Sequence, residues 1–237
     1  MTTSLQKGGP TLPGEWKQER EALVGACRRI ADRGLVVGTA GNVSVRSGDF
    51  VAVTPTGARL ENLTAAEVSI VDMAGELVDG DLAPTSELGL HLGIYAATGA
   101  GAVAHAHAMA STAVASARSE LPCVHYSALG LGGSVRVAPY ATYGSPELAA
   151  NVLAALEGRS AALMQNHGSV VYGGSLAEAV ERLELLEWLA ELYSRCLAIG
   201  TPRILGEAEL LDVVRTATES GYGTVRKATP ADQAVTG

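Results

Sequence analysis

Strand-like and helix-like segments follow one another in this chain without the regular βαβ rhythm that an all-parallel sheet requires. Residues 42–46 and 50–54 are short runs in which apolar and other residues tend to alternate, as in a β-strand. The Ser47-Gly48-Asp49 segment between them is typical of a hairpin turn. Later strand patterns, at 102–107 and 161–172, are separated by helical ones. This mixture predicts a single three-layer α/β/α domain with a central mixed, largely antiparallel sheet.

The chain of 237 residues shows no internal repeat and no linker, so one folded unit is expected. Residues 1–13 carry Gly, Pro, Thr and Lys without periodicity and are expected to be a frayed tail. Residues 226–237 are expected to be a flexible C-terminal tail, which leaves 14–225 as the domain. A domain of this size buries a core that needs no disulfide or structural metal.

The charge of the chain limits its partners. A formal net charge of −8 argues against a nucleic-acid partner and against docking on an anionic membrane.

The three cysteines (Cys27, Cys123 and Cys196) form no CxxC motif and are interpreted as buried thiols in a reducing compartment. The N-terminus has no apolar signal region, and no strongly apolar run of membrane-spanning length is found. A cytoplasmic enzyme is therefore expected.

Histidines give the clearest chemical signal. In His105-Ala106-His107 the two imidazoles lie two residues apart on a predicted strand, so they project from the same face. His167 follows the apolar run at 161–165, at the end of another predicted strand. Three imidazoles with one open position are typical of a catalytic zinc site, although two unrelated histidines near a strand end are the alternative for the pair alone.

Glu87 is the candidate for a fourth group. Ser86 is predicted to cap a helix that stops at Gly99, which places Glu87 in its first turn. On this motif alone, an acid favoured by the helix dipole is the preferred interpretation. His91, four residues later, can share the face of Glu87, but a packed core histidine is favoured for it. His125 is also interpreted as structural, and Tyr126 beside it as a possible proton donor.

Three polar loops could bind a phosphate through hydroxyl and backbone N–H groups: 39–42, 54–57 and 84–86. Each is a weak signal alone, because any turn uses Thr, Gly and Asn. None matches a Walker loop, and no GxGxxG follows a strand.

Taken in order, these motifs resemble the class II aldolase/epimerase family over about residues 20–225. The matching stretches are GTAGNVSVR (38–46), TPTG (54–57), PTSE (84–87), HAH (105–107), HY (125–126), APYATYG (138–144) and NHG (166–168). Within the family, the glutamate at position 87 resembles the residue that the aldolases carry, because the epimerases generally carry aspartate at that position. Tyr143 stands where L-fuculose-1-phosphate aldolases have phenylalanine, near the aldehyde pocket.

The resemblance implies a set of site residues. It implies one Zn²⁺ per chain, bound by His105, His107 and His167 with Glu87 approaching the metal. Glu87 would also be the acid/base at the carbon next to the carbonyl, and burial in an apolar site is expected to raise its pKa. Tyr126 would protonate the oxygen of the departing aldehyde. The phosphate-binding residues implied are Asn42, Thr56, Gly57, Thr85 and Ser86.

The function implied is a zinc-dependent aldolase that reversibly cleaves a ketose 1-phosphate, such as L-fuculose 1-phosphate, to dihydroxyacetone phosphate and a short aldehyde. The family forms homotetramers with active sites between subunits, and the same is expected here. Alternatives within the family are a sugar-phosphate 4-epimerase, a methylthioribulose-1-phosphate dehydratase and an aromatic decarboxylase. A non-catalytic binding module similar to the adducin head domain is a more distant alternative.

Overall fold

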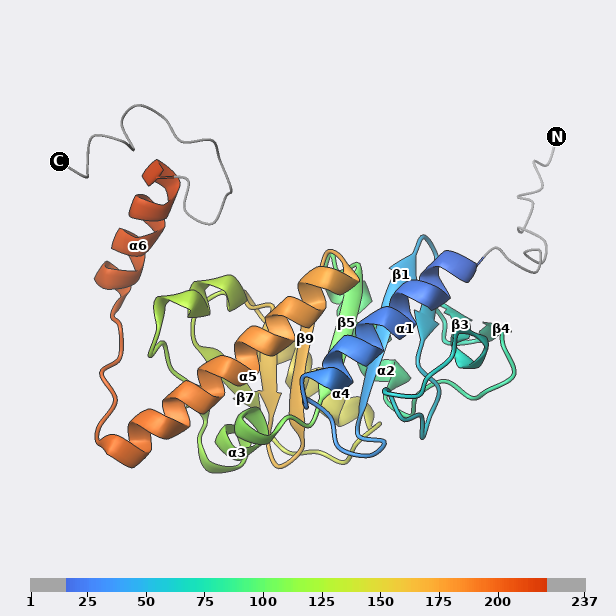
Figure 1. Ribbon diagram of the computed structural model, residues 1–237, viewed down its shortest axis with the longest axis horizontal. Helices are drawn as coiled ribbons and strands as arrows, with labels where there is room; N and C mark the ends of the chain where they lie inside the picture. The colour runs from blue at the N-terminus through green and yellow to red at the C-terminus, as the bar shows by residue number, and fades with distance from the viewer. Residues whose placement is uncertain (1–15, 221–237) are drawn as a thin grey trace.

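The computed structural model describes residues 16–220 and places nine strands in one sheet, in the order β4-β3-β2-β1-β5-β9-β8-β7-β6 (Figure 1). Every neighbouring pair is antiparallel except β7 and β8. The strands are β1 (Gly41–Ser47), β2 (Phe50–Val53), β3 (Ser69–Asp72), β4 (Leu77–Asp79), β5 (Ala102–Ala106), β6 (Glu120–Leu121), β7 (Val135–Ala138), β8 (Ala161–Met164) and β9 (Gly168–Gly173). The predicted mixed, largely antiparallel sheet is confirmed. Both predicted tails, 1–13 and 226–237, lie outside the described residues.

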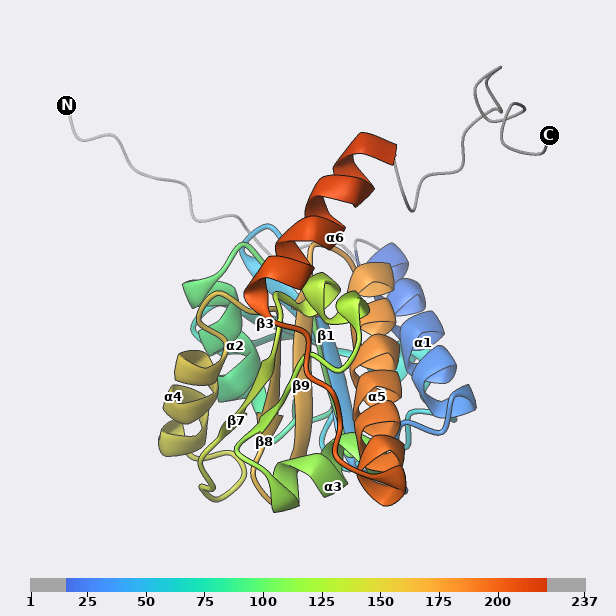
Figure 2. The same cartoon turned by 90° about the vertical axis from the view of Figure 1, so that its left-hand side faces the viewer.

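Helices cover both faces of the sheet, as the edge-on view in Figure 2 shows. One face carries α2 (Leu88–Ala97) and α4 (Pro146–Ala155), and the other carries α1 (Lys17–Asp32), α3 (Met109–Ala117) and α5 (Leu176–Ile199). Two separate hydrophobic clusters fill the spaces between sheet and helices. The predicted three-layer arrangement is confirmed. The last helix, α6 (Glu207–Ser220), stands away from the sheet, has no buried residue and contacts the 3-10 helix η2 (Tyr126–Leu131).

Local sequence signals explain several element boundaries. The β1–β2 hairpin turns at Gly48, whose φ of 61° is in the left-handed region. Ser145 and Ser175 cap α4 and α5, each by accepting a hydrogen bond from a backbone N–H three residues later. Within residues 16–220, none of the helices combines the length and the apolar composition that crossing a bilayer requires.

Some boundaries differ from the sequence prediction. The predicted Ser86 cap is wrong: α2 begins at Leu88, Glu87 occupies the N-cap position, and the Ser86 side chain is exposed. The short edge strands β4 and β6 were not predicted, because two or three residues give no readable alternation and β4 is fully exposed. Cys27 and Cys123 are buried free thiols as expected, whereas Cys196 is only partly buried.

The centre of the sheet carries the residues of interest. Asn42 on β1 lies directly across from His105 on β5, and His105 in turn pairs with Val170 on β9. His167 lies in the turn that joins β8 to β9. A Cβ atom added at Gly168 would lie 2.4 Å from the carbonyl oxygen of Ala106, so the turn can approach β5 this closely only with glycine.

Candidate metal centre and catalytic site

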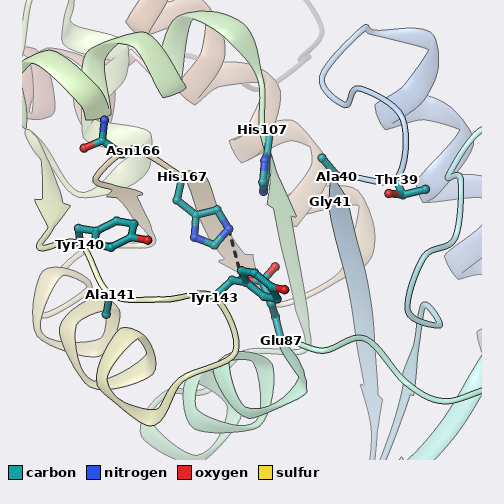
Figure 3. A pocket seen from close by; sticks show the side chains of 10 residues that line it. All are labelled: Thr39, Ala40, Gly41, Glu87, His107, Tyr140, Ala141, Tyr143, Asn166 and His167. Atoms are coloured by element: carbon teal, nitrogen blue, oxygen red, sulfur yellow. Dashed lines mark ion pairs between the residues drawn. The ribbon is translucent and has the colours of Figure 1, made fainter.

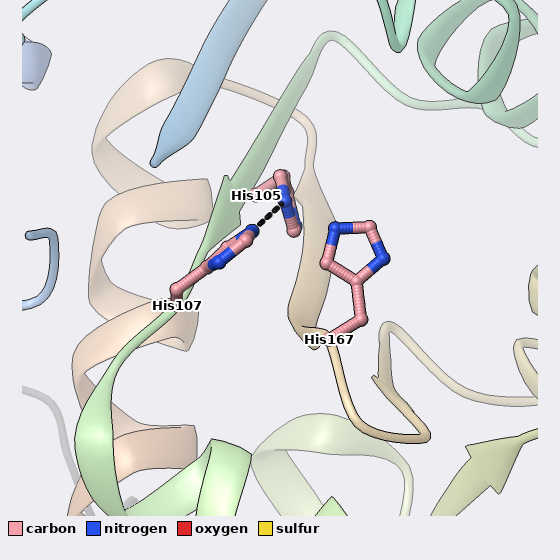
Figure 4. A group of neighbouring side chains, drawn as sticks. All are labelled: His105, His107 and His167. Carbon is pink, nitrogen blue, oxygen red and sulfur yellow. Dashed lines mark hydrogen bonds between the residues drawn. The ribbon is translucent and has the colours of Figure 1, made fainter. Parts of the chain in front are cut away.

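Three histidines converge at the end of β5 (Figure 4). The possible ligand atoms of His105, His107 and His167 all lie within 4.8 Å of one another, and the Nε2 atoms of His105 and His107 are 2.9 Å apart. His105 is fully buried, and the other two rings are partly buried. The strand geometry expected of the His105/His107 pair and the strand-end position of His167 thus bring all three imidazoles together.

A backbone contact fixes the orientation of His105. Its Nδ1 lies 2.8 Å from the carbonyl oxygen of Ser169, which can only accept a hydrogen bond. Nδ1 therefore carries the proton, and the Nε2 lone pair of a neutral ring points into the cluster. A carbonyl partner behind a ring nitrogen is the usual arrangement for a histidine that binds a metal.

Glu87 completes the cluster from the start of α2. Its Oε2 lies 3.1 Å from His105 Nε2, and its Oε1 lies 3.4 Å from His167 Nε2. The side chain is buried, and Oε1 accepts no hydrogen bond. Carboxylate oxygens and imidazole lone pairs that meet in a buried place repel one another unless a proton or a metal ion lies between them. The donor set, three imidazoles and a carboxylate, fits Zn²⁺.

The pKa values of the cluster reflect this crowding. Burial opposes the charge of Glu87, but the charge and hydrogen bond that His105 supplies when it is protonated, together with the amide of Asn42, outweigh it, so without a metal ion the pKa of Glu87 lies well below its ordinary value. The expectation that an apolar site raises this pKa is wrong, because imidazoles and an amide surround the carboxyl. Burial and the neighbouring imidazoles lower the pKa of His107 to about 4 and also lower that of His167.

An open cavity of about 300 Å³ adjoins this cluster (Figure 3). Glu87, His107 and His167 contribute to its wall, and Thr39, Ala40 and Gly41 line another part of it. Tyr140 and Tyr143, both exposed, reach over it from the loop after β7. Asn166, also in the wall, has a φ of 53°, which is uncommon for a residue other than glycine. The cavity offers a substrate direct access to the histidines and the carboxylate.

A family model described as the class II aldolase and adducin N-terminal domain matches residues 21–194. The matched segment contains the three histidines, Glu87 and every element of the sheet. The chain belongs to the class II aldolase family. The family resemblance inferred from the sequence motifs is confirmed.

Individual members of the family are similar over most of their length. The 5-methylthioribulose-1-phosphate/5-deoxyribulose-1-phosphate aldolase of Rhodospirillum rubrum is 38% identical over 201 residues, covering 84% of this chain and 90% of that protein. The L-fuculose phosphate aldolase of Escherichia coli K12 is 38% identical over 195 residues, covering 81% and 90%. A solved structure of an L-fuculose 1-phosphate aldolase superposes with a TM-score of 0.82 at 31% identity, covering 89% of this chain and 100% of that one. The expectation that the chain is an aldolase-type lyase is confirmed, because these relatives are named as aldolases.

Two of the three loops expected to bind phosphate in this class II aldolase, 54–57 and 84–86, lie side by side. Pro55 and Pro84 form an isolated β-bridge, and the Thr85 N–H donates to the carbonyl oxygen of Thr54. Thr56, Gly57 and Ser86 are exposed. Thr85 is buried, and its Oγ1 accepts a hydrogen bond from the Glu87 N–H at 3.3 Å. The two loops thus form one polar surface that leads to Glu87.

Asn42 has a more internal position than a phosphate ligand requires. Its side chain is buried, its Nδ2 donates to Glu87 Oε2 at 3.0 Å, and its Oδ1 lies 2.5 Å from His91 Nε2. One N–H of the amide remains for an anion. His91 is a buried core histidine, as favoured from the sequence, but its contact with Asn42 could not be inferred from the sequence.

Tyr126 lies away from the cavity within its own chain. It belongs to η2, is 37% exposed and lines a separate hollow with residues of α6, among them Asp212 and Val213. His125 accepts a hydrogen bond from the Ser127 N–H and packs edge-on against Trp188, which agrees with a structural role. Within the described chain, Tyr126 is therefore not among the residues that line the cavity beside Glu87 and the histidines.

One further residue near the histidines was missed from the sequence. The carboxylate of Glu187 on α5 accepts hydrogen bonds from the backbone N–H groups of Ala110 and Ser111, at 2.7 and 2.8 Å. These N–H groups belong to the first turn of α3, which begins two residues after His107. Glu187 thereby anchors the segment that follows the histidine. Only the tertiary fold places α5 there, so no local signal could have identified it.

Proposed function

We propose that this chain is a zinc-dependent aldolase that reversibly cleaves a ketose 1-phosphate, such as L-fuculose 1-phosphate, to dihydroxyacetone phosphate and a short aldehyde. The observation that carries the proposal is the convergence of three imidazoles on a buried carboxylate, Glu87, whose Oε1 accepts no hydrogen bond. The cluster opens onto a cavity, and the named relatives are aldolases of sugar phosphates. A scaffold without a catalytic role would have no need of this arrangement.

The metal ligands proposed are His105, His107 and His167, with Glu87 beside them. When bound, Zn²⁺ would supply a Lewis acid that polarises the substrate carbonyl and stabilises the negative charge formed as the carbon–carbon bond breaks. Three protein ligands leave a coordination position for substrate, as is usual for catalytic zinc.

Cleavage removes a proton from the hydroxyl beside the breaking bond and adds one to the carbon that remains, so no net proton is consumed. We assign the carbon-bound proton to Glu87, the carboxylate in the wall of the cavity. As a carboxylate, Glu87 can accept this proton in the direction of synthesis, and the carboxyl group so formed can donate it in the direction of cleavage. Tyr126 of a neighbouring subunit is proposed to serve the aldehyde oxygen, in a homotetramer with active sites between subunits.

Substrate phosphate is proposed to bind where the two bridged loops meet, through Thr56, Gly57, Thr85 and Ser86, and through the second N–H of the Asn42 amide. Exposed hydroxyl and backbone N–H groups suit an oxyanion, and they compensate locally for a net charge of −8. Holding the phosphate there would fix the reacting carbons against Glu87 and the metal.

The end of the substrate that becomes the aldehyde product has a second candidate besides that of L-fuculose 1-phosphate. Tyr140, Ala141 and Tyr143 give the outer wall of the cavity an apolar character, which suits a methyl or methylthio end as well as the end of a fucose-derived sugar. The Rhodospirillum relative, named for 5-methylthioribulose 1-phosphate and 5-deoxyribulose 1-phosphate, favours the same idea. All three substrates would yield dihydroxyacetone phosphate.

Product analysis tests the proposal. The purified protein with Zn²⁺ is offered L-fuculose 1-phosphate, 5-deoxyribulose 1-phosphate, 5-methylthioribulose 1-phosphate, a pentulose 5-phosphate and a hydroxybenzoate. We expect dihydroxyacetone phosphate from at least one ketose 1-phosphate, and far slower cleavage of the dephosphorylated sugar. Epimerised, dehydrated or decarboxylated products alone would favour the other family activities, and no turnover with any compound would favour a binding module.

A further inference from the structure

A buried row of polar side chains connects Glu87 to the interior between α2 and β1. Glu87, His91 and Tyr95 are spaced four residues apart, so their side chains lie on one face of α2, with Glu87 at its N-cap. Asn42 and Ser44 are two residues apart on β1 and share one face of that strand. Four residues of a helix rise about 6.0 Å along its axis, and two residues of a strand extend about 6.6 Å. Because these spacings are nearly equal, successive side chains of the two sets can lie opposite one another.

The side chains form a continuous series of hydrogen bonds. Asn42 Nδ2 lies 3.0 Å from Glu87 Oε2, and Asn42 Oδ1 lies 2.5 Å from His91 Nε2. His91 Nδ1 lies 2.7 Å from Ser44 Oγ, which lies 2.8 Å from the hydroxyl of Tyr95. His91 and Ser44 are fully buried and Tyr95 is 1% exposed, so water does not supply alternative partners.

The donors and acceptors in this series can be assigned from the carboxylate inward. A carboxylate only accepts, so Asn42 presents its NH₂ group to Glu87 and its oxygen to His91. His91 Nε2 must then carry the proton, and Nδ1 of the neutral ring accepts from the Ser44 hydroxyl. Ser44 Oγ in turn accepts from Tyr95. Every hydrogen bond therefore points toward Glu87.

We infer that His91 and Ser44 are positioning residues that act on Glu87 through Asn42. An amide side chain can rotate by half a turn and exchange its oxygen and nitrogen. In this chain that rotation would set Asn42 Oδ1 against the carboxylate of Glu87 and its NH₂ against the Nε2–H of His91. The protonated Nε2 of His91 thus holds the amide in one orientation, and the Ser44 hydroxyl, by donating to Nδ1, stabilises the tautomer that this requires.

This arrangement has a consequence for the reaction, and in that respect the inference rests on the proposed function. Asn42 fixes Glu87 through Oε2 and leaves Oε1 directed at His167, where no hydrogen bond restrains it. Removing a supporting hydrogen bond behind a site residue commonly costs 10- to 100-fold in activity. Loss of the Ser44 hydroxyl should therefore lower kcat by about this factor.

The first test needs no substrate. Protein labelled with ¹⁵N in histidine is studied by NMR at neutral pH, and the His91 ring is assigned from its absence in His91→Gln. We expect a neutral ring with the proton on Nε2 and a hydrogen-bonded lone pair on Nδ1. A ring protonated on Nδ1 alone would reverse the series and overturn the inference.

The second test separates positioning from stability. Ser44→Ala is compared with Ser69→Ala, which removes another fully buried serine hydroxyl, one that donates to the carbonyl oxygen of Leu82 at 2.7 Å. We expect Ser44→Ala to lower kcat about 10- to 100-fold with KM changed less than about threefold, and Ser69→Ala to leave both nearly unchanged. Equal kcat values for Ser44→Ala and wild type would overturn the inference.

A double variant shows whether the effect passes through Glu87. If Ser44 acts by positioning that carboxylate, Ser44→Ala should change the residual kcat of Glu87→Gln by less than about twofold. A full additive loss would mean that Ser44 acts elsewhere and would contradict the inference. Should Ser44→Ala fail to fold, Tyr95→Phe weakens the same series from its far end and takes its place.

The two proposals can fail independently. If wild-type protein cleaves no ketose 1-phosphate, the proposed function fails, and the His91 tautomer still decides the direction of the hydrogen bonds. If wild-type protein cleaves its substrate and Ser44→Ala is equally active, the proposed function stands and the positioning role is refuted.

Discussion

Acid should destabilise this protein through His91. The ring is fully buried and bonded to Asn42 and Ser44, neither of which is charged. Burial lowers the pKa of His91 to about 3, although the negative charge of Glu87 opposes the shift. In the unfolded chain the same imidazole has a pKa of about 6.5.

The size of the effect follows from these two pKa values. Between about pH 6.5 and pH 3 the unfolded chain binds a proton at His91 that the folded chain does not, so the free energy of unfolding falls as the pH is lowered. Above about pH 6.5 the contribution is fully present. Integration from pH 7.5 to pH 5.0 gives a loss of about 2 kcal/mol from this one residue.

Urea unfolding of wild type and His91→Gln at pH 7.5 and pH 5.0, with the same zinc concentration, measures this quantity. Glutamine cannot titrate but keeps a donor and an acceptor for the two partners. Protonation of the other histidines and of Glu87 is common to both proteins and cancels. We expect wild type to lose about 2 kcal/mol more than the variant on acidification. Equal losses would show that His91 is not held neutral and would refute the reasoning.

Four further outcomes are expected. Glu87→Gln should lower kcat by about 10²–10⁴ in a steady-state assay with metal content retained, and an unchanged rate would leave Glu87 only a helix-start residue. Glu187→Ala should lower the free energy of unfolding by about 1–3 kcal/mol, because two N–H groups of α3 lose a charged acceptor, whereas Glu191→Ala on the exposed side of α5 should change it little. Gly168→Ala should destabilise the fold in chemical denaturation, since the new Cβ would meet the Ala106 carbonyl oxygen at 2.4 Å, and wild-type stability would contradict that contact. Mixed and refolded Glu87→Gln and Tyr126→Phe subunits should recover about a quarter of wild-type activity if a cyclic tetramer shares its sites, and no recovery in proven hetero-oligomers would refute sharing.

Local and periodic features of the sequence predicted much of the fold. Capping serines at 145 and 175, the glycine turn at 48 and the alternation of β1 and β2 act over a few residues, and the structure has each of them. The pair His105/His107 was readable for the same reason, because strand alternation alone sends both rings to one side. His167 was placed correctly because a buried strand ends just before it.

Features that depend on distant contacts could not be read in the same way. The direction of the Glu87 pKa shift was wrong because the sequence does not show that imidazoles and the Asn42 amide surround the carboxyl. The cap of α2 was misplaced by one residue because Glu87 turns inward to the histidines instead of continuing the helix. The sequence does show polar residues spaced by four in α2 and by two in β1. Only the fold shows that these two sets of side chains face each other.

The central claim is that three histidines hold a metal required for carbon–carbon bond cleavage. The most direct measurement is the metal content of purified wild type and of His105→Ala, His107→Ala, His167→Ala and His91→Gln, followed by the rate of dihydroxyacetone phosphate release before and after chelation. We expect about one divalent ion per chain in wild type and His91→Gln and almost none in the other three, with chelation abolishing activity that Zn²⁺ restores. Full cleavage activity in rigorously metal-free protein, or undiminished metal content in all three histidine variants, would contradict the account.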